Sequence, residues 1–590
     1  MTDATDRPWN DASRPVAERV EKLLSAMTLD EKAGLFFQTI IGLSDLNEAN
    51  AAFSAPSARE YIEQRHLTHF NLVGGAATAG EMASWHNELQ RLAASTRLGI
   101  PVTLSTDPRH AFTDNPGTAM LAGPFSQWPE PLGLAATRSE ELVEQFGDIA
   151  RKEYLAVGLR VALHPQVDLA TEPRWSRQSG TFGEDASVAS TLGAAYVRGF
   201  QTDSFGRHSV STMAKHFPGG GPQKDGEDPH FAHGREQVYP GGMGSLHLAP
   251  FEALIAAGTR QMMPYYGMPV GTEWEEVGFA FNRGVLTDLL RTRLGFDGIV
   301  CSDWGVLNDS EIFGAHFPAR AWGVEHLSPA ERMAKALTAG VDQFGGEACP
   351  ELLVELVTSG TISEARVDES ARRLLREKFE LGLFDAPFVD QNAANSIVGN
   401  AEFRQAGDYA QRASITLLTN GTDQAPLLPL GHGRRIYVEG IDQTIAGAYG
   451  EVVDDPANAE IAIIRLAAPF EERSTVFENF FHSGSLDFPD SVLEHLRTIA
   501  SHVPTVVDIF ADRPAILEPI TTLAHAVCVN WGASAEALLD VLTGAFEPQG
   551  RLPFDLPRSM DAVRAGREDV PFDTPDPLFR YGHGLSYPAV

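Results

Sequence analysis

The first 345 or so residues alternate short apolar segments with longer amphipathic ones, and this alternation constrains the fold more than any other feature. Helical patterns such as 80–95, 139–158 and 284–295 lie between apolar segments that have the character of strands. Strands that alternate with helices build a parallel sheet. The candidate strands are 69–75, 101–107, 160–168, 211–217, 260–266, 298–304 and 341–347. With an eighth strand expected near 35–40, the predicted fold is α/β, a closed (β/α)8 TIM-like barrel.

The remainder of the chain predicts a second domain of a different kind. Residues 362–385 have the pattern of a helix closed by Gly382, and a loop rich in Asn, Ala and Pro follows. We therefore expect a barrel domain over 1–385, a linker over 386–400 and an αβα sandwich over 401–590. The sandwich strands are expected at 434–440, 460–466, 504–510 and 524–531, with helices at 491–502 and 534–544. No Walker loop or GxGxxG pattern follows any of them, so no nucleotide site is expected.

Composition narrows the classes of partner. A chain of 590 residues is too long for one core, and the formal charge of −33 repels nucleic acid and anionic membranes. We expect a neutral or cationic small molecule as ligand, with a homo-oligomer left open. The three cysteines, Cys301, Cys349 and Cys528, form no CxxC pair, so neither a zinc site nor a disulfide framework is expected. Because the polar start MTDATDRPWND also lacks an apolar signal core, the predicted location is cytoplasmic.

Polar residues gather where the predicted barrel strands end. In a (β/α)8 barrel the carboxyl ends of the strands carry function. The residues at those ends are Asp107, Asp168, Lys215, His216, Tyr265 and Asp303. Their accumulation at one end of many strands is a stronger signal than any one of them, and it places a candidate site there.

The stretch GFDGIVCSDWG, residues 295–305, predicts a particular chemistry. A retaining glycosidase needs two carboxyl groups, donors that hold hydroxyls, and an aromatic face for the sugar ring. Asp303 could supply the nucleophile and Trp304 the aromatic platform, although an aspartate in this position can also simply cap a strand. Lys215 and His216 could hold neighbouring hydroxyls, or they could be a solvated lysine beside a satisfied histidine.

Three further segments offer sugar-binding side chains. Asp107 in STDPRH could accept from two hydroxyls at once or cap a turn. Arg174 and Arg177 in EPRWSRQSGTFGED could bind sugar or form buried ion pairs. Tyr265 in MPYY could donate its phenol hydrogen to a nucleophilic carboxylate, or pack in the barrel core.

Taken together, these motifs resemble glycoside hydrolase family 3. The motifs are SDW after GFDGIV, KHF, EPRW followed by FGED, and an early Asp in DPRH, and the likeness runs from about residue 27 to PLFRYGHGLSY, 577–587. The resemblance implies a barrel, then a six-stranded sandwich with the active site between them. It also implies retaining exo-hydrolysis of β-linked sugars without a metal or cofactor. A β-glucosidase is favoured, with a β-xylosidase, a β-N-acetylglucosaminidase or a non-catalytic sugar-binding protein as alternatives.

The same resemblance implies roles for single residues. Asp303 matches the nucleophile, Trp304 the ring beside it and Tyr265 a nearby tyrosine, and Arg174 is expected to be structural. The residues that match those holding the nonreducing-end sugar are Asp107, Arg177, Lys215 and His216.

The acid/base remains open between two segments. Glu471 and Glu472 follow a predicted strand in IIRLAAPFEERS, 463–474, and Glu471 is preferred because Arg473 would share its side in an extended loop. Both could instead merely lie on a surface loop. The alternative is the pair Asp228 and His230, which is similar to the His–Asp acid/base of bacterial β-N-acetylglucosaminidases, in a segment expected to form a rim loop.

Overall fold

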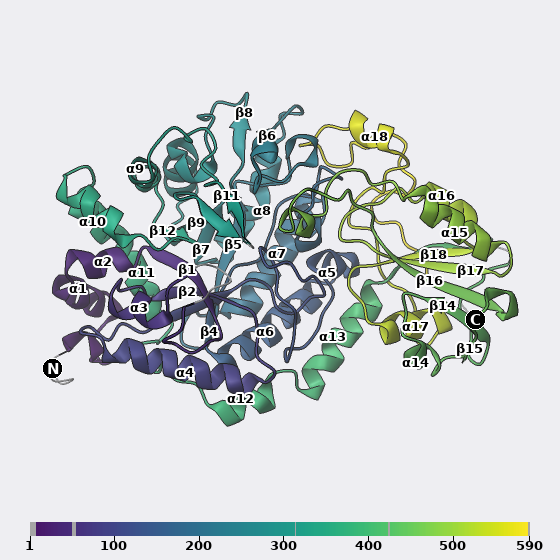
Figure 1. The fold of residues 1–590 in the computed structure, drawn as a ribbon, viewed down its shortest axis with the longest axis horizontal. Coiled ribbons are helices and arrows are strands. Elements are labelled where there is room, and N and C mark those ends of the chain that lie inside the picture. Colours follow the sequence, from purple (N-terminus) through teal and green to yellow (C-terminus); the bar gives the residue numbers. More distant parts are fainter. Residues whose placement is uncertain (1–6, 50–54, 313, 423–424, 588–590) are drawn as a thin grey trace.

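An eight-stranded parallel barrel forms the amino-terminal part of the computed structural model, which describes residues 7–49, 55–312, 314–422 and 425–587 (Figure 1). The barrel strands close in the order β1-β12-β9-β7-β5-β4-β3-β2. Their bounds are β1 Phe37–Gly42, β2 His69–Val73, β3 Thr103–Thr106, β4 Leu159–Ala162, β5 Ser211–Phe217, β7 Gln261–Pro264, β9 Ile299–Trp304 and β12 Gln343–Gly345. All eight predicted strands are present, so the predicted fold class is confirmed.

Helices between the strands cover the outside of the barrel. Helix α4, Ala79–Ser95, begins with a capping box in which Thr78 and Glu81 satisfy each other's backbone amides. Helix α6, Glu140–Val157, ends at Gly158, whose φ of +87° closes it. The segment predicted at 284–295 is helical, but η8, Gly284–Arg293, has π-helical hydrogen bonding.

The segment predicted as a linker is not an irregular loop. Helix α11, Glu364–Glu380, ends the barrel, and helix α12, Gln391–Ile397, lies inside the expected linker range of 386–400. The α12 residue Asn395 accepts a hydrogen bond from the amide of Gly80 at 2.8 Å, and α12 packs on α4 and α6. The chain therefore stays attached to the barrel surface before α13, Ala401–Ser414, leads to the second domain (Figure 1).

The second domain is a six-stranded sheet with helices on both faces. The strand order is β13-β18-β17-β16-β14-β15, parallel except for β13 against β18. The bounds are β13 Thr416–Asn420, β14 Arg435–Glu439, β15 Glu451–Val452, β16 Ile461–Ala467, β17 Thr505–Phe510 and β18 Ala526–Asn530. Figure 1 shows α15, Asp490–Ala500, and α16, Glu518–Leu523, on one face and α14, Gln443–Ala446, and α17, Ala535–Thr543, on the other. Strands β13 and β15 had no counterpart among the segments read from the sequence.

A long loop of the second domain covers the carboxyl end of the barrel. This covering loop, 468–489, connects β16 to α15. Its Arg473 forms an ion pair with Glu227 of the barrel at 2.7 Å, and its Phe480 carbonyl accepts a hydrogen bond from Asn115 at 2.8 Å. The two domains thus meet where the barrel strands end. Across the described residues, no helix combines the length and apolarity needed to cross a membrane.

Candidate active site

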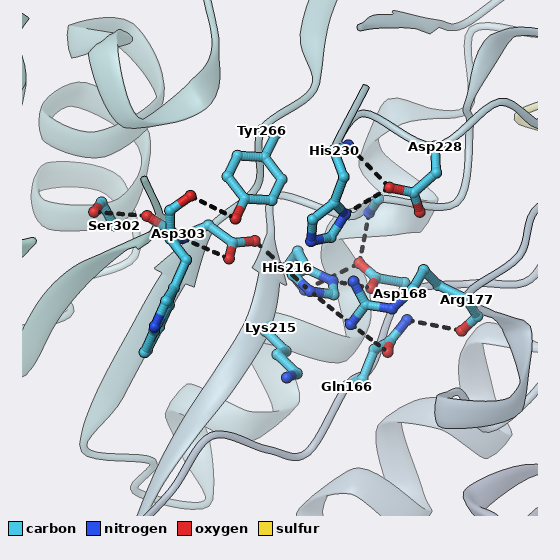
Figure 2. A network of polar contacts seen from close by, with 12 residues as sticks. Gln166, Asp168, Arg177, Lys215, His216, Asp228, His230, Tyr266, Ser302 and Asp303 are labelled. Carbon is cyan, nitrogen blue, oxygen red and sulfur yellow. Dashed lines mark hydrogen bonds and ion pairs between the residues drawn. The ribbon is translucent and has the colours of Figure 1, made fainter. Parts of the chain in front are cut away.

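A cavity of about 260 Å³ opens at the carboxyl end of the barrel strands. It contains six of the residues expected from the sequence, which come from several barrel strands or the loops after them, and Figure 2 shows four of these, Arg177, Lys215, His216 and Asp303. These are Asp107, Arg177, Lys215, His216, Asp303 and Trp304. Residues scattered over about 200 positions of the sequence are therefore brought together as the barrel topology predicts.

Asp303 presents one free carboxylate oxygen inside this cavity. Its Oδ1 accepts a hydrogen bond from the Trp304 amide at 2.8 Å, which fixes the orientation of the carboxylate at the end of β9. Its Oδ2 is buried, has no hydrogen-bond partner within the described part of the chain, and lies 4.0 Å from Nε2 of His216. An oriented but unpaired oxygen is the arrangement that a nucleophile needs.

Trp304 lies against a surface made of glycine. A Cβ on Gly345 or Gly346 would come within 2.5 or 2.6 Å of the indole ring, and Gly346 also has a φ of +70°. The sequence FGGE at the end of β12 therefore allows the ring to pack on bare backbone while it lines the cavity. This contact sets the position of the aromatic platform beside Asp303.

Lys215 and Asp107 form a buried polar pair in the wall of the same cavity. Nζ of Lys215 lies 3.2 Å from Oδ1 of Asp107, whose Oδ2 accepts from the Asn71 amide at 3.2 Å. Burial lowers the pKa of Lys215, and the charges of Asp107 and Asp303 oppose that shift. A lysine and a carboxylate held in this way offer a donor and an acceptor to neighbouring hydroxyls.

His216 is held by two partners that define its proton. Its Nδ1 lies 2.7 Å from Oδ2 of the fully buried Asp168, and its Nε2 lies 3.3 Å from a guanidinium nitrogen of Arg177. Burial, followed by the charge of Arg177, holds the pKa of His216 well below its ordinary value. The neutral ring therefore donates from Nδ1 to Asp168 and accepts at Nε2 from Arg177.

A second histidine–aspartate pair lies in the same cavity, on the segment expected to be a rim loop. His230 lines the cavity, and its Nδ1 lies 2.6 Å from Oδ1 of Asp228 (Figure 2). Although burial alone would raise the pKa of Asp228, the contacts with His230 and the charge of Arg177 lower it to about 2. Burial lowers the pKa of His230, against the opposing effect of Asp228. The segment does not merely form a rim, because it places a titratable histidine in the cavity wall with its aspartate partner behind it.

Tyr265 packs in the barrel core, which was the alternative to a contact with the nucleophile. Its hydroxyl is fully buried with no partner among the described residues, and its ring packs against His216 at 4.4 Å. The neighbouring Tyr266 lines the cavity instead, and its hydroxyl donates to the Trp304 carbonyl at 2.8 Å. Burial and the adjacent charge of Asp303 raise the pKa of Tyr266 well above its ordinary value. The sequence MPYY indicated that a tyrosine would line the cavity. Which of the two rings enters the cavity depends on where β7 ends.

Glu471 and Glu472 are not among the residues that line the cavity. Both are exposed on the covering loop, and Glu471 packs so closely against Gly484 that a Cβ there would collide with its carboxylate. The expectation that one of them faces Asp303 is therefore not met. The residue that this loop contributes to the cavity wall is Phe477.

Two other expectations concern residues next to the site and the chemistry of metals. Arg174 pairs with Glu172 at 2.8 Å outside the cavity lining, in keeping with a structural role. No group of three or more His, Cys, Asp or Glu side chains suited to a metal ion occurs in the ranges that the structure describes. The cavity also contains Arg320, which no motif indicated because it lies in a long loop after β9.

Both halves of the chain match known domains. Residues 28–377 match the glycosyl hydrolase family 3 N terminal domain, and residues 387–587 match the glycosyl hydrolase family 3 C-terminal domain. The chain is 53% identical to a protein of Emericella nidulans named beta-glucosidase C, over 98% of this chain and 94% of that one. It is 40% identical to a periplasmic beta-glucosidase/beta-xylosidase of Dickeya chrysanthemi, over 98% of this chain and 91% of that one.

Solved structures show the same fold. A mutant exo-1,3/1,4-beta-glucanase from a Pseudoalteromonas species aligns with a TM-score of 0.78 at 23% identity, over 98% of this chain and 96% of that one. A beta-glucosidase of Listeria innocua in complex with glucose aligns with a TM-score of 0.77 at 22% identity, over 97% and 83% of the two chains. From its matched domains and its extent of identity, this chain belongs to glycosyl hydrolase family 3.

Proposed function

We propose that the protein is a retaining, exo-acting β-glucosidase. The observation that carries the proposal is the unpaired Oδ2 of Asp303, which lies inside a cavity lined by Asp107, Arg177 and Lys215. The name of the relative at 53% identity supports glucose as the sugar. The name of the relative at 40% identity supports β-xylosides as a second substrate class.

The first step transfers the sugar to Asp303. Its Oδ2 attacks the anomeric carbon, the bond from that carbon to the leaving oxygen breaks, and the leaving oxygen takes the Nε2 proton of His230, which acts in its imidazolium form and is left neutral with its remaining proton on Nδ1. Oδ1 keeps its hydrogen bond from the Trp304 amide, so only Oδ2 forms the new covalent bond. Arg177, Lys215 and Asp107 hold hydroxyls of the nonreducing-end sugar during this step.

The second step releases the sugar. A water molecule attacks the anomeric carbon, gives a proton to Nε2 of His230, and the bond to Asp303 breaks. We assign the acid/base to His230 because it lines the cavity, and because Asp228 accepts a hydrogen bond from its Nδ1 and stabilises the imidazolium. Glu471 and Glu472 lack both features, since they are exposed and outside the cavity lining.

The acid/base assignment is tested by leaving-group dependence. His230→Gln should lower kcat/KM on an alkyl β-glucoside about 100- to 10,000-fold. The loss should be much smaller on a dinitrophenyl β-glucoside, because its leaving group departs without protonation. Added azide should restore turnover of the activated substrate and yield a glucosyl azide. The matched controls Glu471→Gln and Glu472→Gln should retain wild-type kinetics. A fall of that size in either control, with His230→Gln unaffected, would return the role to the covering loop.

The nucleophile and the sugar are tested separately. Asp303→Asn should abolish turnover of an aryl β-glucoside while thermal unfolding stays cooperative. Full activity in Asp303→Asn, or a wild-type protein that binds glucose but turns over no glycoside, would support a non-catalytic sugar-binding protein instead. A panel of nitrophenyl β-glucoside, β-xyloside and β-N-acetylglucosaminide ranks the three candidate sugars by kcat/KM.

We also propose a cytoplasmic location. The support is that Cys301, Cys349 and Cys528 are free and buried in the structure, which suits a reducing compartment. Separation of cytoplasmic from exported proteins in the native host, followed by an activity assay of each fraction, checks this. Activity confined to the exported fraction would contradict it.

A further inference from the structure

Arg320 is a buried cation without a hydrogen-bond or ion-pair partner among the described residues. It is 4% exposed and lines the same cavity as Asp303. Within the described residues its guanidinium makes no hydrogen bond or ion pair, and its Nε is buried without a partner. Burial lowers the pKa of Arg320, while the charges of Tyr266, Asp303 and Glu347 oppose that shift. A buried charge of this kind is unfavourable unless something completes its hydrogen bonding.

The guanidinium is nevertheless held in one orientation. Its carbon lies 4.1 Å above the ring of Phe317 and 6.0 Å from the ring centre of Tyr266. The backbone amide of Arg320 donates to the Gly305 carbonyl at 3.0 Å, and a Cβ on Gly305 would come within 2.5 Å of the guanidinium. Stacking fixes the plane of the group and leaves its N–H edges free for a ligand.

The topology places Arg320 away from the residues that hold the nonreducing-end sugar. Asp107, Arg177 and Lys215 come from strands β3, β4 and β5 or from the loops that follow them. Strand β9, which carries Asp303, lies between β7 and β12 in the barrel. Arg320 belongs to the connection from β9 to β12. Arg320 therefore reaches the cavity from a different connection than Asp107, Arg177 and Lys215 do.

Arg320 and His230 flank the same tyrosine. The His230 ring packs against Tyr266 with 4.7 Å between centres, and Trp322, two residues after Arg320, donates to the Pro229 carbonyl at 2.8 Å. The proposed proton donor to the leaving oxygen and the unpaired guanidinium are thus on neighbouring segments. Both therefore reach the cavity beside Tyr266.

We propose that Arg320 binds the leaving group, and that its guanidinium donates hydrogen bonds to hydroxyl oxygens of a second, neutral sugar unit. This rests on the proposed function, because it takes the nonreducing-end sugar to lie over Asp303. The substrate class that follows is a β-linked glucose disaccharide or the end of a longer β-glucan, recognised through its second unit. An aryl leaving group has no hydroxyls to accept these bonds.

The test compares two substrates in one variant. Arg320→Met keeps the bulk of the stem and removes every donor. It should lower kcat/KM on a β-linked glucose disaccharide at least about tenfold, and change kcat/KM on nitrophenyl β-glucoside by less than about threefold. Arg320→Lys should recover part of the disaccharide activity. The matched control is Arg235→Met, an exposed arginine paired with Glu325 at 3.3 Å, which should leave both substrates at wild-type values.

Two further measurements separate the possible failures. In an Asp303→Asn background, calorimetry should show that Arg320→Met weakens disaccharide binding and leaves glucose binding unchanged. The melting temperature of Arg320→Met should change little, because the variant loses the stacking on Phe317 but no hydrogen bond or ion pair within the described residues, and it no longer buries a charge. Equal losses on both substrates, or none on either, would overturn the proposal. A wild-type protein that hydrolyses neither substrate would overturn the proposed function, while the calorimetry would still decide what Arg320 binds.

Discussion

Asp168→Asn should disable the site without a visible change in the fold. Asp168 is fully buried and accepts three hydrogen bonds, from the His216 amide at 3.1 Å, the Gly220 amide at 2.5 Å and the His216 ring at 2.7 Å. An asparagine oxygen can still accept from the two amides. Its NH2 group, however, faces a ring nitrogen that carries a proton, so the imidazole must move its proton to Nε2.

The consequence reaches Arg177. With a proton on Nε2, His216 becomes a donor that faces the guanidinium donor 3.3 Å away, and Arg177 must shift from its place in the cavity. Loss of one preorganised donor costs about 100-fold in kcat, or about 2.7 kcal/mol of transition-state stabilisation. Loss of the charge-assisted bond to the ring should also lower the free energy of unfolding by about 2–3 kcal/mol.

The pH dependence gives this prediction a second readout. Burial raises the pKa of Asp168 to about 6. When pH falls through about 6, the carboxyl gains a proton, donates to the ring nitrogen and causes the same tautomer change in the wild-type protein. Wild-type kcat should therefore fall as pH drops below about 6. The pH profile of kcat for Asp168→Asn should lack this acidic limb.

The assay uses an aryl β-glucoside at mildly acidic to neutral pH, with unfolding followed by circular dichroism. The matched control is Asp342→Asn, another fully buried aspartate, which pairs with Arg291 and Arg373 beside the amino end of β12. That variant should lose stability yet keep wild-type kcat in the folded fraction. If Asp168→Asn has a kcat within about threefold of wild type, or keeps the acidic limb, the tautomer argument is refuted.

Two more predictions concern the contacts between the domains. Phe477→Ala removes a buried ring that packs on Phe317 with 5.1 Å between centres and lines the cavity. KM for aryl β-glucosides should therefore rise with little change in kcat, and the free energy of unfolding should fall by about 3 kcal/mol. An unchanged KM would separate this ring from substrate binding. Burial raises the pKa of Glu184, which accepts from the amides of Asp555 and Phe572 of the second domain, to about 8. Because the folded pKa exceeds the unfolded one, this group stabilises the fold fully below about pH 4.5 and loses that contribution as pH rises through about 8. Glu184→Gln should flatten the fall of melting temperature over this range, and an unaltered slope would contradict the assignment.

The barrel could be predicted from the sequence because each strand carries its own signal. Segments such as 211–217 and 298–304 are apolar, end in polar residues and coincide closely with β5 and β9. Closure then follows from topology, which also explains why six site residues were identified by their place at or near strand ends. In contrast, β15 is only Glu451–Val452, too short for periodicity to detect.

The alternatives at the site stay open in the sequence where position depends on a loop or a register. Tyr265 and Tyr266 are adjacent and chemically alike, so only the end of β7 at Pro264 decides which ring enters the cavity. Arg320 has no motif around it, because its role comes from the path of a long loop. The choice of Glu471 relied on alternation in an extended segment, whereas its neighbourhood is set by Gly484 on the returning part of the covering loop.

The position of the covering loop changes what the second domain contributes. In the proposed mechanism the barrel supplies both the nucleophile and the acid/base, and the second domain supplies side chains that pack around them. Phe481 of the covering loop packs on the His230 ring at 4.5 Å between centres, and Arg473 pairs with Glu227, the residue before Asp228. Since burial is the main cause that lowers the pKa of His230, the loop adjusts the proton affinity of a group on the other domain. Loss of the Phe481 ring would expose the imidazole and raise its pKa toward the ordinary value, so this one aromatic contact couples the covering loop to the strength of the acid/base.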